Sequence, residues 1–261
     1  MKLLRGMIRS LKAVVDLLLP RTCIACEKAL LLEEEHLCSD CLADLPLTRF
    51  HLLRHSPMAY RFSAIIQEYL EPIWTAGNAA HERYAYATAL FFYDGQGDYR
   101  HIQHRLKYQG DIRIGQYFGK MLGSRLAGAV HFTDIDMVIP VPLHWTRQWK
   151  RGYNQAEVIA SALAREMDVP MRTDILMRSR RTRTQTKLDI EGKARNVAGA
   201  FAVSEDAAAG FRNGAVPRHI VLVDDVFTTG STLGACFKAL RSVFPPQVRI
   251  SVATLAFVGG A

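Results

Sequence analysis

The chain has 261 residues, 49% of them hydrophobic, and a formal net charge of +8 at pH 7. This length suits one large domain or one domain with a small additional module, and the apolar content is enough for a sizeable core. No run of about 18 apolar residues occurs, so we expect no membrane-spanning helix. The excess of basic residues favours anionic partners, such as phosphates or nucleic acids, over basic ones.

Residues 1–20 combine basic side chains with an apolar stretch that resembles a signal peptide. Leu11, Val14 and Leu18 recur at helical spacing, however, and Pro20 follows where a small-residue cleavage site would be needed. We therefore expect an amphipathic helix over residues 1–20 that packs on the body of the protein, with contact to a membrane surface as the alternative. Without a secretory signal, the expected location is the cytoplasm.

Four of the five cysteines form two Cys-x-x-Cys pairs separated by eleven residues: Cys23, Cys26, Cys38 and Cys41. Two such pairs joined by a short loop complete a tetrahedral sulfur site, which suits Zn²⁺. Two disulfides would need an oxidising compartment, and redox Cys-x-x-Cys motifs rarely occur as a close pair, so zinc is favoured over both. Because four thiolates leave no open position, the sequence predicts a structural zinc knuckle over residues 21–45.

Two further residues, His36 and Cys236, are not expected to bind the zinc. His36 precedes Cys38 by two residues, but we treat it as a bystander because four thiolates already suffice. The fifth cysteine, Cys236, lies among Leu233, Phe237 and Leu240 at helical spacing, which predicts a buried core thiol.

Beyond the cysteines, residues 46–85 lack a clear period and are expected to form a connector or hood with short helices. From residue 86 onward strands and helices alternate. The expected strands cover residues 87–93, 137–139, 201–203, 219–223 and 248–257. The expected helices cover residues 99–108, 114–126, 154–165 and 232–243, whereas residues 204–217 are expected to form an Ala/Gly-rich loop. Continuously apolar strands in this order predict an α/β fold, a parallel sheet with helices on both faces, over residues 86–261.

The most informative motif is an apolar run that ends in two adjacent carboxylates, Asp224 and Asp225, followed by a hydroxyl-rich loop that opens a helix. The carboxylates can accept hydrogen bonds from vicinal ribose hydroxyls. Backbone N–H groups and hydroxyls of the loop can surround a phosphate: Thr228, Thr229, Gly230, Ser231 and Thr232. Such residues also serve as caps and turn formers. Adjacent acids at the end of a buried strand, however, repel each other unless a ligand or cation engages them. Residues 224–232, the Asp-Asp loop, therefore predict a ribose 5-phosphate site.

The Asp-Asp loop resembles the phosphoribosyl-pyrophosphate (PRPP) loop of the type I phosphoribosyltransferases. Three further segments extend the resemblance: Leu106 to Asp111, Pro140 to Gln155, and Arg178 to Phe201. In this order, and with the four cysteines in front, they resemble the ComF family of bacterial proteins linked to competence and DNA uptake, to which the GntX protein is similar. The resemblance covers nearly the whole chain from Cys23 onward, although residues 45–85 carry no motif of the family.

The resemblance implies a type I phosphoribosyltransferase-like fold with PRPP and Mg²⁺ as ligands. It assigns Asp224 and Asp225 to the ribose hydroxyls and residues 228–232 to the 5′-phosphate. Arg147, Lys150 and Arg151 follow the strand end at 140–142, where this fold keeps its pyrophosphate loop, and Lys107 is expected to reach in from the preceding helix. Positioned Arg and Lys side chains stabilise pyrophosphate as it leaves.

Residues 172–195 hold eight basic and three acidic residues, a net charge of +5. This stretch is either a solvated loop that aids solubility or a flap that contacts pyrophosphate or single-stranded DNA. The candidate DNA contacts are Arg178, Arg181, Arg183, Gln185 and Arg195. Trp145 and Trp149 keep base stacking open as well, although packing is the commoner role of such a pair.

These patterns leave three functions open. The favoured one is a ComF-like protein that binds PRPP, Mg²⁺ and single-stranded DNA and acts in DNA uptake during natural transformation. The alternative is an active phosphoribosyltransferase with an unidentified nucleobase or amine acceptor, for which the sequence shows neither an acceptor pocket nor a general base. In a third alternative, the zinc knuckle docks a partner such as a helicase.

Overall fold

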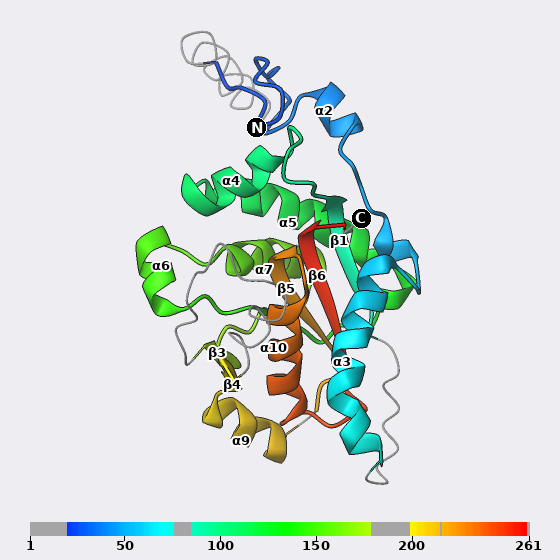
Figure 1. Cartoon of the computed structure of the whole chain (residues 1–261). Helices are drawn as coiled ribbons and strands as arrows, with labels where there is room; N and C mark the ends of the chain where they lie inside the picture. Colours follow the sequence, from blue (N-terminus) through cyan, green and yellow to red (C-terminus); the bar gives the residue numbers. More distant parts are fainter. Residues whose placement is uncertain (1–19, 76–84, 179–198, 215, 260–261) are drawn as a thin grey trace.

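The computed structural model describes residues 20–75, 85–178, 199–214 and 216–259 (Figure 1). Most of the predicted N-terminal helix, residues 1–19, lies outside the described residues. So does the stretch from 179 to 198, which contains Arg181, Arg183, Gln185 and Arg195.

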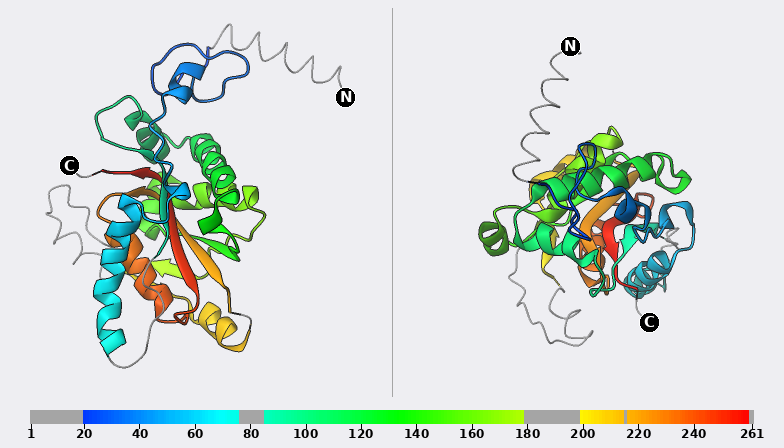
Figure 2. Two further views of the ribbon diagram at one scale, coloured as in Figure 1. Left: turned by 90° about the vertical axis from the view of Figure 1, so that its right-hand side faces the viewer. Right: turned by 90° about the horizontal axis from the view of Figure 1, so that it is seen from above.

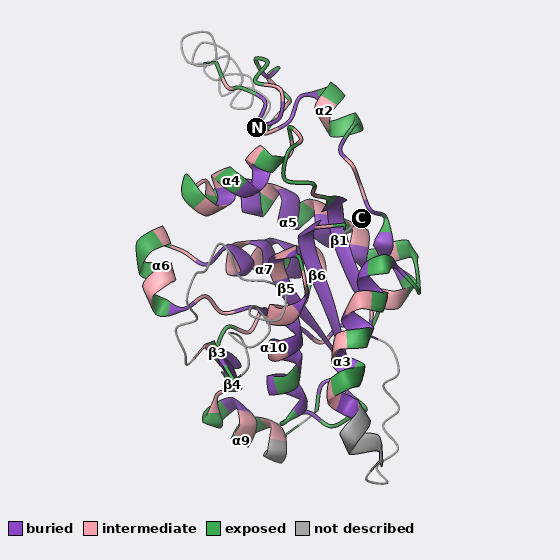
Figure 3. Cartoon of the chain, viewed as in Figure 1, coloured by how far each residue is buried: buried purple, intermediate pink, exposed green. Residues whose placement is uncertain are grey.

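A parallel four-stranded sheet forms the centre of the molecule, as the apolar strands predicted. Its order is β1 (Ala87–Phe92), β6 (Arg249–Phe257), β5 (His219–Phe227) and β2 (Met137–Pro140). All three strand pairs are parallel. The side chains of β5 alternate between two cores: Ile220 and Leu222 face one, and Val221 and Val223 face the other. Because both faces are buried, the strands are mostly apolar (Figure 3).

Helices cover both faces of this sheet (Figure 2). On one face lie α5 (Ile112–Ala127) and α7 (Gln155–Glu166), with α4 (Arg100–Tyr108) packed against α5. On the other lie α3 (Pro57–Thr75) and α10 (Ser231–Arg241). Asn154, the first residue of the expected helix 154–165, caps α7, because its Oδ1 accepts a hydrogen bond from the backbone N–H of Ala156 at 3.2 Å. The layers are those of an α/β protein and are consistent with a type I phosphoribosyltransferase-like fold.

Shorter elements complete the described chain. They are α2 (Ser39–Ala43), the 3₁₀ turns η1 (Phe50–Leu52) and η2 (Val130–Phe132), α6 (Trp145–Arg151) and α9 (Glu205–Asn213). A second, antiparallel sheet pairs β3 (Leu176–Arg178) with β4 (Phe201–Val203). Within the described ranges, no helix has both the length and the apolar character needed to cross a bilayer.

Three expectations differ from the structure. Residues 204–217 are not a loop, because Ser204 Oγ accepts from the N–H of Ala207 and starts α9, whose first turn is acidic. The expected short helices of residues 46–85 include one of 19 residues, α3, whose apolar face packs on the sheet. The sequence did not predict β3, because a three-residue strand carries no readable period.

The four-cysteine segment stands at one end of the molecule, next to α4 and α5 (Figures 1 and 2). Its few apolar side chains, such as Ile24 and Leu37, join the core that contains Phe118 of α5. Tyr99 Oη donates a hydrogen bond to the carbonyl oxygen of Cys41 at 2.8 Å. The segment is therefore held against the α/β body, and its treatment as a separate domain stays a prediction.

Candidate functional site

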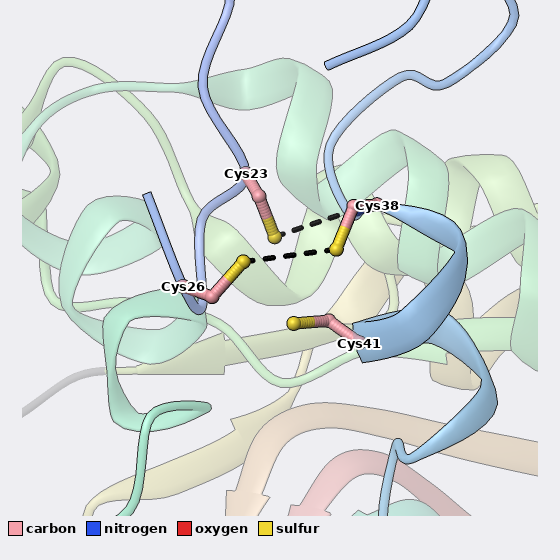
Figure 4. A group of neighbouring side chains, drawn as sticks. All are labelled: Cys23, Cys26, Cys38 and Cys41. Carbon is pink, nitrogen blue, oxygen red and sulfur yellow. Dashed lines mark hydrogen bonds between the residues drawn. The ribbon is translucent and has the colours of Figure 1, made fainter. Parts of the chain in front are cut away.

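The four cysteines converge on one point, as the spacing predicted (Figure 4). Their Sγ atoms all lie within 4.8 Å of one another, and Cys23 Sγ accepts a hydrogen bond from the N–H of Cys38 at 3.4 Å. Burial acts to raise the pKa of Cys23, but backbone hydrogen bonds outweigh it and lower that pKa to about 7. A donor set of four sulfurs fits one tetrahedral Zn²⁺. His36 packs edge-on against Tyr117 instead, with 5.2 Å between ring centroids.

The two carboxylates of the Asp-Asp loop lie near the carboxyl end of β5, where α/β sheets bind ligands. Asp225 Oδ2 is 2.7 Å from Lys107 Nζ, which reaches in from α4. Asp224 Oδ1 accepts the N–H of Asp225 at 2.8 Å. Burial acts to lower the pKa of Lys107, yet the neighbouring Asp225 carboxylate outweighs it and holds that pKa above its usual value. Lys107 thus supplies the cation that adjacent acids require.

The surroundings of Asp224 raise its pKa. Burial, and then the charge of Asp225, raise the pKa of Asp224 to about 7, while Lys107 and Arg178 act in the opposite direction. A carboxyl poised near neutrality at the end of a buried strand is a marker of a functional site. The Asp-Asp loop therefore holds one carboxylate paired with Lys107 and one whose pKa is raised by burial and by its neighbour.

Basic side chains of α6 and β3 act electrostatically on this acid pair and its lysine. Burial lowers the pKa of Arg178, the charge of Arg147 lowers it further, and the charge of Asp224 acts in the opposite direction. Arg151 donates to Gln155 Oε1 at 2.9 Å, and its charge acts on Lys107. The structure thus pairs Lys107 with Asp225 and places Arg178, which the sequence had grouped with DNA contacts, where its charge acts on Asp224.

The hydroxyl loop of residues 228–232 leads into α10. Gly230 precedes the helix with φ +79°, a backbone conformation that residues other than glycine rarely adopt. In the same loop, Thr229 Oγ1 lies 2.8 Å from Ser231 Oγ. A Cβ at position 230 would lie 2.6 Å from both Ile65 Cδ1 and Phe227 Cζ. Glycine is therefore required both by the backbone and by the close approach of α3.

We expect Gly230→Ala to lower the free energy of unfolding by more than about 2 kcal/mol, because it combines left-handed backbone strain with steric overlap. Urea denaturation measures the change. Gly110→Ala is the matched control, because Gly110 also has a positive φ, +68°, but no atom lies within 4 Å of its added Cβ. Equal losses in the two variants would contradict the proposed contact with Ile65.

The two tryptophans of α6 are not packed in the core, although packing was the role that the sequence favoured for them. Trp145 is 72% exposed and Trp149 is 87% exposed, because the seven-residue α6 buries no side chain. By contrast, Cys236 is fully buried in α10, which confirms the predicted core thiol.

Sequence reasoning also missed Gln103 of α4, whose Nε2 donates to the carbonyl oxygen of Asp225 at 3.1 Å. Only the helical position of Gln103, four residues before Lys107, could have indicated this contact.

Comparisons with known proteins agree with this organisation. A double zinc ribbon domain matches residues 14–51, which supports zinc as the metal of the four cysteines.

Competence protein F of Haemophilus influenzae is 34% identical over 149 residues, 56% of this chain and 63% of that protein. The chain is thus similar to this competence protein over about half of its own length. DNA utilization protein YhgH of Escherichia coli strain K12 is 31% identical over 140 residues, covering 52% of this chain and 58% of that protein. Competence protein ComFC of Bacillus subtilis is 29% identical over 140 residues, covering 52% and 50%. The chain thus spans between half and two thirds of the length of these relatives.

Proposed function

We propose that this protein binds PRPP with Mg²⁺ at the Asp-Asp loop and acts, with single-stranded DNA as a second ligand, in DNA uptake during natural transformation. The observation that carries the proposal is the convergence of an acid pair, a hydroxyl loop at a helix start and several basic groups at one edge of the sheet. The names of the relatives, which speak of competence and DNA utilization, support the role in DNA uptake.

In this proposal each group has a distinct task. Asp224 and Asp225 accept hydrogen bonds from the ribose hydroxyls, and residues 228–232 hold the 5′-phosphate. Arg147, Arg151 and Arg178 neutralise the pyrophosphate, whose charge suits guanidinium forks. Carboxylate oxygens are ligands that Mg²⁺ accepts, usually together with substrate phosphates, so the acid pair fits that ion. Because Lys107 holds Asp225 in the free protein, ligand binding exchanges that ion pair for ribose contacts.

Isothermal titration with PRPP and Mg²⁺ tests the proposal. We expect saturable heat at one site per chain, and titrations in the presence of a single-stranded oligonucleotide then show whether the two ligands are coupled. No heat with PRPP and Mg²⁺ at concentrations up to the millimolar range would contradict the proposed site.

The affinity for PRPP and Mg²⁺ is expected to rise as the pH increases from 6 to 8. The pKa of Asp224 is raised to about 7, so the proton competes with the ligand below pH 7 and is absent above pH 8. Binding near pH 7 should then release protons, which titrations in buffers of different ionisation enthalpy detect. In the ligand-free protein the same shift lowers stability as the pH rises from about 4 to 7, because the folded state binds the proton more tightly than the unfolded state. A pH-independent affinity would contradict this role of Asp224.

Single-stranded DNA is favoured as a second ligand by α6, which exposes Trp145 and Trp149 beside Lys150 and Arg151. Exposed aromatic rings stack unpaired bases, and basic neighbours contact phosphates. We expect Trp149→Ala to weaken oligonucleotide binding about tenfold, within the range of one base–aromatic stack. Fluorescence anisotropy at increasing salt measures this, and the affinity should fall steeply with salt. Val130→Ala, 79% exposed on η2, is the control. An affinity that is independent of salt would contradict the proposal.

The alternative is that the same site catalyses transfer. A nitrogen of the acceptor forms a bond to C1 of the ribose while the bond from C1 to the pyrophosphate oxygen breaks. The electron pair leaves with pyrophosphate, and the proton of the nitrogen passes to solvent. Arg147 and Arg178 would stabilise the charge that develops on the leaving group. Release of pyrophosphate from PRPP, dependent on an added acceptor, would support this alternative.

A further inference from the structure

The helix α4 joins two parts of the molecule to which separate roles have been assigned. At its start, the hydroxyl of Tyr99, the residue that precedes the helix, donates a hydrogen bond to the carbonyl oxygen of Cys41 at 2.8 Å. Near its end, Lys107 Nζ lies 2.7 Å from Asp225 Oδ2. One short helix therefore connects the four-cysteine segment to the Asp-Asp loop.

Two further hydrogen bonds fix the second half of α4. Gln103 Nε2 donates to the carbonyl oxygen of Asp225 at 3.1 Å, so the helix holds the backbone of this residue as well as its carboxylate. The hydroxyl of Tyr153, in the turn before α7, donates to the carbonyl oxygen of Leu106. Because of these contacts, α4 cannot shift without disturbing Asp225.

The apolar side of α4 packs in a core that the four-cysteine segment shares. Ile102 and Leu106 of the helix are fully buried in the hydrophobic cluster that also contains Ile24 and Leu37 of the segment. A helix rises about 1.5 Å per residue, so the two anchored positions of α4 lie about 12 Å apart along its axis. Since close-packed interiors transmit strain, a displacement of the first turn reaches the last one.

The contact made by Tyr99 depends on the fold of the four-cysteine segment. Its acceptor is the backbone of Cys41, one of the four sulfur donors that converge on the metal site. A segment with few core side chains folds around its metal, so removal of zinc takes away this acceptor together with the packing partners of α4. The first turn of α4 then loses the segment as its neighbour.

We propose that α4 couples the four-cysteine segment to the Asp-Asp loop, with Tyr99 as the positioning residue at the junction. The zinc-loaded segment holds the start of α4, and α4 holds Asp225 through Lys107 and Gln103. Loss of the metal therefore loosens the Asp-Asp loop. The consequence for PRPP rests on the proposed function, because it concerns the affinity of that site, whereas the coupling within the free protein does not.

Hydrogen exchange of the full-length chain tests the coupling. When a chelator removes zinc, we expect exchange to become about fivefold faster at residues 100–108 and 224–227, in addition to residues 21–45. Tyr99→Phe keeps the ring and the four cysteines but removes the hydroxyl. With one zinc ion per chain still bound, it should accelerate exchange about fivefold at residues 100–108 and 224–227, within the range of one lost hydrogen bond.

Tyr117→Phe is the matched control. Tyr117 of α5 also packs against the four-cysteine segment, edge-on to His36, but its hydroxyl makes no hydrogen bond with the residues that the structure describes. Exchange in this variant should match the natural chain. A second measurement is titration with PRPP and Mg²⁺, for which we expect about fivefold weaker binding in Tyr99→Phe and unchanged binding in Tyr117→Phe, because only the first variant loosens the position of Asp225.

The outcomes separate this coupling from the proposed function. Faster exchange at residues 224–227 in Tyr99→Phe alone supports the coupling even where PRPP gives no heat, and only the proposed function then fails. Exchange at residues 224–227 that neither zinc removal nor Tyr99→Phe changes overturns the coupling and leaves PRPP binding standing. An equal acceleration in α3, on the other face of the sheet, also overturns it, because it reports a general loss of stability.

Discussion

Replacing Cys38 by serine will release the zinc ion and unfold the four-cysteine segment. The four sulfurs lie within 4.8 Å of one another, so losing one opens the tetrahedral site. A segment with so few core side chains depends on its metal, and structural zinc contributes about 10–16 kcal/mol in comparable peptides. We expect the zinc content to fall from one ion per chain to near zero, measured by plasma mass spectrometry. Hydrogen exchange should show lost protection over residues 21–45.

The matched control is Cys236→Ala, which removes the remaining cysteine from the core of α10, far along the chain from the metal site. It should lower the free energy of unfolding through a small cavity but keep the zinc. If Cys38→Ser retained a full zinc ion, or if both variants lost it, the four-cysteine site would be wrong.

The double substitution Asp224→Asn, Asp225→Asn is expected to weaken binding of PRPP and Mg²⁺ at least a hundredfold. Charge-assisted hydrogen bonds are worth about 1.5–3 kcal/mol each, and the metal loses its anionic ligands. The amides keep the volume of the carboxylates, so the sheet should remain folded. Removal of Asp224, whose charge is disfavoured by burial, should also abolish the loss of stability between about pH 4 and 7.

Asp134→Asn is the control for the binding measurement on the double variant. Asp134 has a positive φ of 55°, which asparagine tolerates, and it belongs to a distant, exposed ion pair with Arg218. It should leave the affinity for PRPP unchanged. Unaltered binding in the double variant would remove the Asp-Asp loop as the ligand site. Pyrophosphate release by the double variant at the rate of the natural chain would likewise exclude it as a catalytic site.

The free protein explains how two adjacent acids persist at the end of a buried strand. The sequence indicated that a ligand or a cation must engage them, and the cation is Lys107, 2.7 Å from Asp225. Lys107 was identifiable because it belongs to the Leu106–Asp111 segment of the ComF resemblance. Its pairing with Asp225 rather than Asp224 depends on how α4 packs beside β5, which no local pattern records.

Features carried by local chemistry were readable from the sequence. The paired cysteines, the cap at Asn154 and the apolar strands that end in Asp224 each follow from neighbours within a few residues. Amino-acid composition gave a wrong prediction for one short helix. Residues 205–213 form α9 although they are rich in Ala and Gly, because one cap and an acidic first turn suffice.

The sequence by itself determined the zinc ligands, the parallel sheet and the loop at its carboxyl edge, because spacing and periodicity encode all three. Only the tertiary structure decided that the charges of Arg147 and Asp224 act on Arg178, that Ile65 of α3 closes on Gly230, and that Gln103 of α4 donates to the carbonyl oxygen of Asp225. Each of these contacts joins elements that are far apart in the chain. They arise from how helices settle on both faces of the sheet, and that packing depends on the sum of many side chains rather than on any single motif.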